Sequence, residues 1–224
     1  TGRLLIHAGT HKTASTYIQE RLHLNQLSLK KHGYTYQHPN PGKLTFKNLA
    51  SDICKGKLDS LANFIDKHQH ESNNLLLSAE QFTVPLTNRK TLKKIQKIAK
   101  EKNYDITIII FIRSQLDYIN SRYTYSLRRF YHTCSFDEFL QAALNGHLPG
   151  ESRQRGRLVK RNDIFNFWHF FKPLLNARSS GLEVKFIPFK RANQDPFDQF
   201  LESIGLIPGP QWLQNKKTPS LPVS

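Results

Sequence analysis

The residues best suited to chemistry lie together near the start of the chain, directly after the apolar run Leu4–Ala8. The segment Gly9-Thr10-His11-Lys12-Thr13-Ala14-Ser15-Thr16 carries a lysine and several hydroxyl side chains, and a helical pattern begins at Ser15. A loop that ends at a helix N-terminus presents free backbone N–H groups and the positive end of the helix dipole. With the ammonium of Lys12 and the neighbouring hydroxyls, about six donors can converge on one phosphate-sized anion.

This loop does not match the nucleotide-triphosphate loop, which requires Gly-x4-Gly-Lys-Ser/Thr. His11 stands directly before Lys12 and Ile6 stands five residues earlier, so both glycines are missing. Two later apolar runs also lack the magnesium-binding Asp expected of an ATPase or kinase, since one continues into Ser78-Ala79-Glu80 and the other into Arg113. The pattern therefore disfavours an ordinary ATPase or kinase.

The loop resembles the 5′-phosphosulfate loop of the sulfotransferases that use 3′-phosphoadenosine 5′-phosphosulfate (PAPS), whose pattern is G-x-x-K-T-G-T-T. The chain departs from that pattern at Ala14, in place of Gly, and at Ser15, in place of Thr. Ser15 keeps its hydroxyl, but Ala14 restricts the backbone where Gly would be free. The resemblance implies that PAPS is bound by Lys12, Thr13, Ala14, Ser15 and Thr16.

A second element of the same family is an Arg that closes an apolar strand, with a Ser eight residues later in the next helix. Ile108–Ile112 followed by Arg113 and then Ser121 fits this arrangement, although Ser114-Gln115 stands where Asp-Pro or a similar pair is usual. The resemblance implies that Arg113 and Ser121 bind the 3′-phosphate of PAPS. A guanidinium offers a planar fork of donors suited to phosphate oxygens.

The likeness extends along most of the chain and points to the bacterial-type and carbohydrate-type branches. The order of further positions also matches the bacterial-type branch: Gln19, Asn25, Gly33-Tyr34 and Leu77-Ser78-Ala79-Glu80. In the tail, Lys216 and Lys217 resemble a basic loop that closes over PAPS in carbohydrate sulfotransferases. These two lysines are therefore further expected cofactor contacts.

Sulfuryl transfer resembles phosphoryl transfer in its loose, in-line transition state, so positioning and electrostatics should dominate. We expect Lys12 to stabilise negative charge on the oxygen that bridges phosphate and sulfate, with no metal required. Glu80 follows a buried strand, in the region where the family places its acid–base residue, and is expected to accept the proton of the acceptor. His11 and His7 are rival bases, and His7 lies on the strand, where a packed histidine is the more common case.

Four apolar runs predict buried strands at Arg3–Ala8, Asn74–Ser78, Ile106–Ile112 and Glu183–Pro188, with a short fifth near Tyr34–Tyr36. Helical patterns fall between them, at 15–31, 58–70, 91–101, 117–130, 136–144, 164–172 and 196–204. Pro173 is expected to end or kink the helix before it. This alternation predicts an α/β, P-loop-like three-layer fold, with a parallel sheet of about five strands flanked by helices, in a single domain over 1–224.

The charge balance points to anionic partners. Lys and Arg number 33 against 17 Asp and Glu, which leaves a net charge of +16. Such an excess concentrates anions near the protein. We expect a small-molecule or glycan acceptor, acidic in character, and the basic run Arg153–Arg161 is a candidate contact. A divergent P-loop nucleotide kinase and a basic nucleic-acid-binding module remain alternatives, but we expect no nucleic acid because no recognisable binding motif is present.

The remaining features concern the compartment. Cys54 and Cys134 are the only cysteines and have neither metal nor redox spacing, so we expect reduced thiols in a cytoplasmic protein. No apolar run is long enough to cross a membrane, and no membrane segment is expected. The spacing of His, Cys and carboxylates predicts no metal site.

Overall fold

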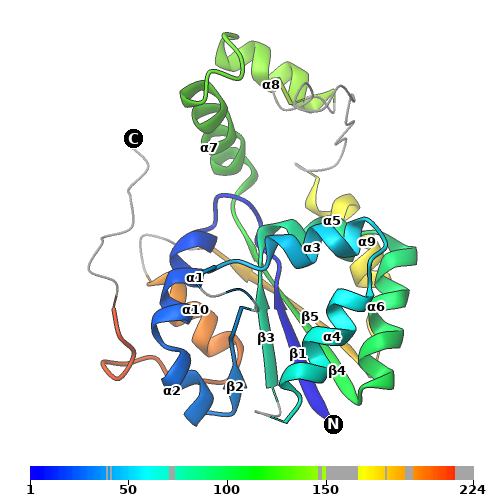
Figure 1. Cartoon of the computed structure of the whole chain (residues 1–224). Helices are drawn as coiled ribbons and strands as arrows, with labels where there is room; N and C mark the ends of the chain where they lie inside the picture. The colour runs from blue at the N-terminus through cyan, green and yellow to red at the C-terminus, as the bar shows by residue number, and fades with distance from the viewer. Residues whose placement is uncertain are drawn as a thin grey trace. The chain divides into compact units, whose positions relative to one another are not determined.

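The structure, a computed structural model, describes residues 1–38, 40, 42–70, 74–145, 148–149, 166–179, 181–189 and 194–214. At its centre lies a sheet of five parallel strands in the order β2-β3-β1-β4-β5 (Figure 1). The strands are β1 (Gly2–His7), β2 (Tyr34–Thr35), β3 (Asn74–Ser78), β4 (Tyr104–Ile112) and β5 (Leu182–Pro188). All five lie where the sequence predicts strands.

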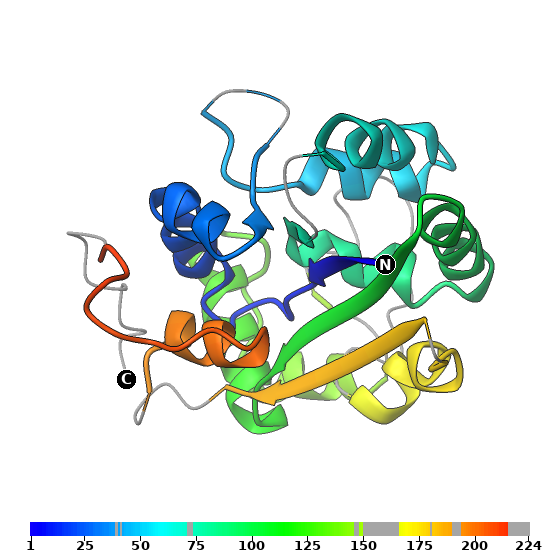
Figure 2. The same ribbon diagram turned by 90° about the horizontal axis from the view of Figure 1, so that it is seen from below.

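The strands are continuous apolar runs because helices cover both faces of the sheet. Leu4 and Leu5 point to opposite faces, and both are fully buried. Figure 2 shows α1 (Ser15–Leu24), α2 (Gln26–Lys31) and α10 (Pro196–Ser203) on one side of the sheet. On the other side lie α3 (Lys47–Cys54), α4 (Asp59–His68) and α6 (Arg89–Glu101). The predicted architecture, a parallel sheet between helical layers, is confirmed.

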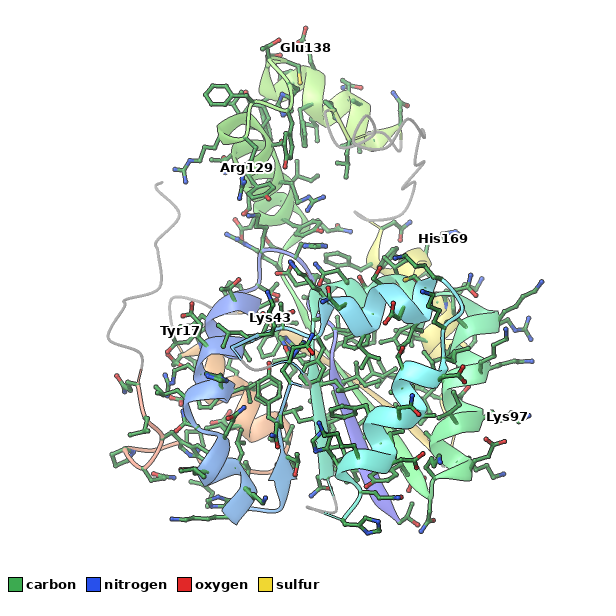
Figure 3. All side chains as sticks on the ribbon, in the orientation of Figure 1. Tyr17, Lys43, Lys97, Arg129, Glu138 and His169 are labelled. Carbon is green, nitrogen blue, oxygen red and sulfur yellow. The ribbon has the colours of Figure 1, made fainter. Side chains whose placement is uncertain are left out.

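The face of α6 shows the periodicity that the sequence predicts. Leu92, Ile95 and Ala99 are buried against the sheet, whereas the four lysines at 93, 94, 97 and 100 are exposed. Lys97, labelled in Figure 3, points away from the sheet. Part of the large positive charge is therefore carried on a solvated helix face.

Two helix predictions need correction. The helical pattern over 15–31 is two helices, because Asn25 turns the chain between α1 and α2. Its side-chain amide donates to the carbonyls of Arg21 at 2.8 Å and Leu213 at 3.0 Å, and the Leu213 amide donates to Asn25 Oδ1 at 2.7 Å. The second correction concerns the helix predicted over 164–172, which is α9 (Phe167–Asn176). Of the two effects expected of Pro173, ending the helix or kinking it, the first does not occur, since Pro173 lies inside α9.

The described residues divide into two compact units. The first is formed by Thr1–Ile112 and by the described residues from Pro173 on, and it contains the whole sheet. The second is formed by the described residues of Arg113–Lys172, with α7 (Gln115–Arg128), α8 (Phe136–Leu144) and a core around Tyr118 and Phe139. Two short elements after β3, the 3-10 turn η1 (Glu80–Phe82) and α5 (Thr83–Leu86), belong to the first unit.

Candidate functional site

The loop after β1 is tied to the neighbouring strand β4. The Ala8 amide donates to the Ile109 carbonyl at 2.9 Å, and the Thr10 amide donates to the Phe111 carbonyl at 2.8 Å. The Phe111 amide in turn donates to the Gly9 carbonyl at 2.6 Å. Hydrogen bonding to β4 thus continues to Thr10, three residues beyond the last residue of β1. The loop therefore starts from a fixed position at the carboxyl edge of the sheet, where parallel sheets bind their ligands.

Three positions of the loop adopt left-handed backbone conformations. Gly9 has φ 87°, Lys12 has φ 65° and Ala14 has φ 57°. At Gly9 the close approach of Glu80 adds a second reason for glycine, because a Cβ there would lie 3.3 Å from Glu80 Cα. At Ala14 the left-handed conformation explains why glycine would be favoured, because this conformation costs an L-residue with a Cβ about 1–2 kcal/mol.

The N-terminus of α1 is arranged to receive an anion. Ala14 is its N-cap residue and supplies no side-chain hydrogen bond, and the first turn contains no acidic residue. The first N–H groups of a helix have no intrahelical acceptors and carry the positive end of the dipole. Lys12 stands two residues before this cap and adds its ammonium. These residues fit a phosphosulfate group better than they fit any neutral ligand.

The hydroxyls of the loop differ in what they do. Thr13 is fully buried and its hydroxyl donates to the Thr10 carbonyl at 2.6 Å, so this side chain shapes the loop. The Ser15 hydroxyl, also buried, lies 3.4 Å from the same carbonyl and hydrogen-bonds to Glu80. Thr16 is exposed in the first turn of α1. Of the three predicted hydroxyl donors, Thr16 is thus the one on the surface.

Glu80 and His11 form a hydrogen-bonded pair beside the loop. The distance between His11 Nδ1 and Glu80 Oε2 is 2.5 Å, and both side chains are partly exposed. Burial acts to raise the pKa of Glu80, but its bond and charge interaction with His11, the Ser15 hydroxyl and the charge of Lys12 together lower it below its usual value. Glu80 is therefore a carboxylate at neutral pH, and it holds one ring nitrogen of His11.

This pairing follows from the register of the sheet. β1 and β3 are parallel neighbours with His7 opposite Ser78, and the Ala79 amide donates to the His7 carbonyl at 3.0 Å. Residues that follow the two strands, His11 and Glu80, therefore meet at one edge. Both residues are candidate bases in the sequence, but the pattern does not predict their contact. The signal available was the pair of buried strands, each followed within four residues by a titratable side chain.

His7 is a packed histidine. It is fully buried, its Nδ1 lies 2.7 Å from the Ser78 hydroxyl, and its ring meets Phe111 and Phe200 edge-on. Burial lowers the pKa of His7 to about 4, against a smaller raising effect from the charge of Glu80. The ring is therefore neutral at physiological pH and closed off from solvent.

The remaining predicted site residues belong to the second unit or fall outside the described residues. Arg113 directly follows β4 and begins the second unit, in which Ser121 occupies a partly exposed position on α7. Ser114 caps α7, its hydroxyl accepting from the Asp117 amide at 3.3 Å. Lys216, Lys217 and the basic run over 153–161 lie outside the described residues.

Metal and membrane features can be judged for the described part of the chain. Within it, no cluster of three His, Cys, Asp or Glu side chains could hold a metal ion. None of the helices described is both long and apolar enough to cross a membrane. Both cysteines, Cys54 and Cys134, are free thiols.

Comparison with known structures shows a shared fold. The chain is similar to a sulfotransferase from Alicyclobacillus acidocaldarius, with a TM-score of 0.50 and 14% identity, over 99% of this chain and 87% of that one. A structure from the PezAT chromosomal toxin–antitoxin system of Streptococcus pneumoniae matches more distantly, with a TM-score of 0.36 and 14% identity, over 87% of this chain and 70% of that one. No protein-family model and no curated protein sequence matches the chain. The fold is thus that of a P-loop-like sulfotransferase.

Proposed function

We propose that this protein is a sulfotransferase that moves the sulfuryl group of PAPS to a hydroxyl or amine of an acceptor. The observation that carries the proposal is the uncapped N-terminus of α1, with Lys12 before it and the His11–Glu80 pair beside it. A positive anion site thus adjoins a group that can accept a proton. Transfer of a charged group to a hydroxyl or amine needs both, and the fold shared with a sulfotransferase supports the assignment.

The loop and helix residues would hold the phosphosulfate end of PAPS. Backbone N–H groups at the start of α1 and the Thr16 hydroxyl donate to it, while Thr13 and Ser15 keep the loop in shape. PAPS, when bound, supplies the sulfuryl group. Lys12 places its ammonium where negative charge increases during transfer, and preorganised charge of this kind is usually the largest contribution to catalysis.

The His11–Glu80 pair would take the proton of the acceptor. Glu80, with its lowered pKa, is a weak base, and it accepts the Nδ1–H of His11. In that tautomer the Nε2 of His11 carries the lone pair and can accept a proton. We therefore assign proton acceptance to His11 and the positioning of its ring to Glu80.

The opposite end of the cofactor is assigned from the resemblance. Arg113 and Ser121 are proposed to bind the 3′-phosphate, and Lys216 and Lys217 are proposed additional contacts. For the acceptor, the net charge of +16 supports an acidic small molecule or glycan.

Calorimetry with 3′-phosphoadenosine 5′-phosphate, the desulfonated product, tests the proposal. We expect micromolar affinity, about −8 kcal/mol. Arg113→Ala should weaken binding about 10–100-fold, since a hydrogen bond to a charged group contributes about 1.5–3 kcal/mol. Arg128→Ala, which removes an exposed guanidinium from α7, is the matched control and should bind like the wild type.

The same titration separates the alternatives. Binding of ATP with magnesium in place of the bisphosphate would identify a nucleotide kinase. Binding to duplex DNA that falls steeply with salt, with no affinity for the bisphosphate, would identify a nucleic-acid-binding module. Either result overturns the sulfotransferase assignment.

A further inference from the structure

A second polar group centred on a histidine lies in the unit that contains α7 and α8; it consists of Ser126, His132 and Cys134. After α7 the chain turns through Phe130, which has a left-handed φ of 55°, and the Tyr131 amide donates to the Ser126 carbonyl at 3.0 Å. This turn brings His132 back against α7. Its Nε2 lies 2.8 Å from the Ser126 hydroxyl oxygen, and its Nδ1 lies 3.0 Å from Cys134 Sγ.

The hydrogen bonds of Ser126 favour one tautomer of His132. Ser126 is buried, and its hydroxyl has two carbonyl acceptors within reach, those of Arg122 at 2.8 Å and Tyr123 at 3.0 Å. When the hydroxyl proton is on either carbonyl, the Ser126 oxygen accepts from His132, and the ring proton is on Nε2. The lone pair is then on Nδ1, and Nδ1 faces the thiol of Cys134. Burial lowers the pKa of His132, which keeps the ring neutral and able to accept.

Neighbouring side chains hold this arrangement in place. The His132 ring packs against both Tyr123 and Phe139, with ring centroids 5.6 Å and 5.2 Å away. The Tyr123 hydroxyl donates to the Cys134 carbonyl at 3.3 Å, and Ser135, the next residue, caps α8. Cys134 itself is partly exposed. A nucleophile, a base and a group that orients the base are therefore in hydrogen-bonding contact in that order, and the nucleophile is partly exposed.

We propose that Cys134 is a nucleophilic thiol and a modification site for soft carbon electrophiles. In the reaction the thiol proton passes to Nδ1 of His132 while the sulfur attacks the electrophilic carbon. With an alkyl iodide, an S–C bond forms, the C–I bond breaks and iodide leaves. Ser126 keeps the ring oriented by accepting its Nε2–H.

The charged residues nearest to Cys134 in the sequence do not favour one sign. Arg128 and Arg129 lie at the end of α7, while Asp137 and Glu138 lie in the first turn of α8. The Glu138 carboxylate accepts from the Ser135 amide at 2.7 Å in a capping box. With basic and acidic groups balanced, His132 is the group that distinguishes this thiol.

The chain provides its own control in Cys54. Cys54 is also a free cysteine, and the residue is exposed at the end of α3. Its thiol is nevertheless partly desolvated by the residues around it, and this raises the pKa of the thiol. The test is the rate of labelling of each cysteine by iodoacetamide at pH 7, resolved by peptide mass spectrometry. We expect Cys134 to react roughly tenfold faster or more, as base assistance permits. Equal rates, or faster labelling of Cys54, overturn the proposal.

Two variants test the mechanism. His132→Gln should lower the labelling rate of Cys134 to about that of Cys54. The midpoint of urea unfolding shows whether the variant keeps the stability of the wild type. Ser126→Ala keeps the contacts of the ring with Tyr123 and Phe139 but removes the acceptor of its Nε2–H, so labelling of Cys134 should slow several-fold. If both variants remain folded and neither changes the labelling rate of Cys134, His132 does not contribute to the reactivity of the thiol and the proposal is wrong.

Discussion

The end of β1 and the loop that follows it each present a histidine, and the two residues have opposite surroundings. His7, on the strand, is fully buried between aromatic rings, with the Ser78 hydroxyl on Nδ1. His11, four residues later, is partly exposed and has a carboxylate on Nδ1. The two histidines belong to one short segment, yet burial keeps His7 neutral and away from solvent. His11 instead has a carboxylate partner and is accessible to solvent.

His11→Gln is expected to have the largest effect, because it removes the proposed base. Turnover should fall about 10²–10⁴-fold, the contribution of a well-placed general base, while affinity for the bisphosphate should stay close to that of the wild type. The measurement is transfer of radiolabelled sulfate from PAPS to an acidic oligosaccharide. His23→Gln, the same change at an exposed position of α1, should have little effect.

Glu80→Gln sharpens the assignment within the pair. It keeps an acceptor for His11 Nδ1 but removes the negative charge that stabilises a protonated ring. Turnover should therefore fall, but by less than in His11→Gln, because the ring keeps its position. If Glu80→Gln lowers turnover more than His11→Gln does, the carboxylate is the base and the roles are reversed.

Lys12→Ala is expected to lower turnover by roughly a hundredfold or more at saturating PAPS, as loss of one preorganised donor does. Lys94→Ala removes the same charge from the exposed face of α6 and is the matched control. Near-normal turnover of Lys12→Ala would remove this lysine from the mechanism.

His7 should make stability depend on pH. Its pKa is about 4 in the folded protein and 6.5 in the unfolded chain. Between these values the unfolded state binds more protons, so stability falls as the pH drops from 6.5 to about 4, by about 3 kcal/mol at most. Urea unfolding of the wild type and His7→Gln across this window measures it. The wild type should lose more free energy of unfolding than the variant, and parallel losses would contradict the prediction.

The sequence predicts the strands better than it predicts the site. Runs such as Leu4–Ile6 and Ile106–Ile112 are apolar because both faces of the sheet are covered, and that information is local. The break at Asn25 was missed because it depends on Leu213, which is distant in the chain. The same holds for the His11–Glu80 contact, which depends on the pairing of β1 with β3.

Backbone conformation is the other part that residue types did not determine. The departure at Ala14 from the family glycine was visible in the sequence, but the left-handed conformations of Lys12 and Ala14 were not. The assignments of Arg113, Ser121, Lys216 and Lys217 to PAPS stay predictions, because they rest on the resemblance.

Ala14→Gly should have the smallest effect and the opposite sign from most substitutions. Glycine relieves the left-handed cost of about 1–2 kcal/mol but adds about 0.4–1 kcal/mol of entropy to the unfolded chain. The net result is a gain in unfolding free energy of about 0–1.6 kcal/mol. Ala62→Gly, the same change inside α4, should instead lose about 1 kcal/mol. Urea unfolding of both variants compares them, and a loss at both positions would show that the loop conformation of Ala14 carries no strain.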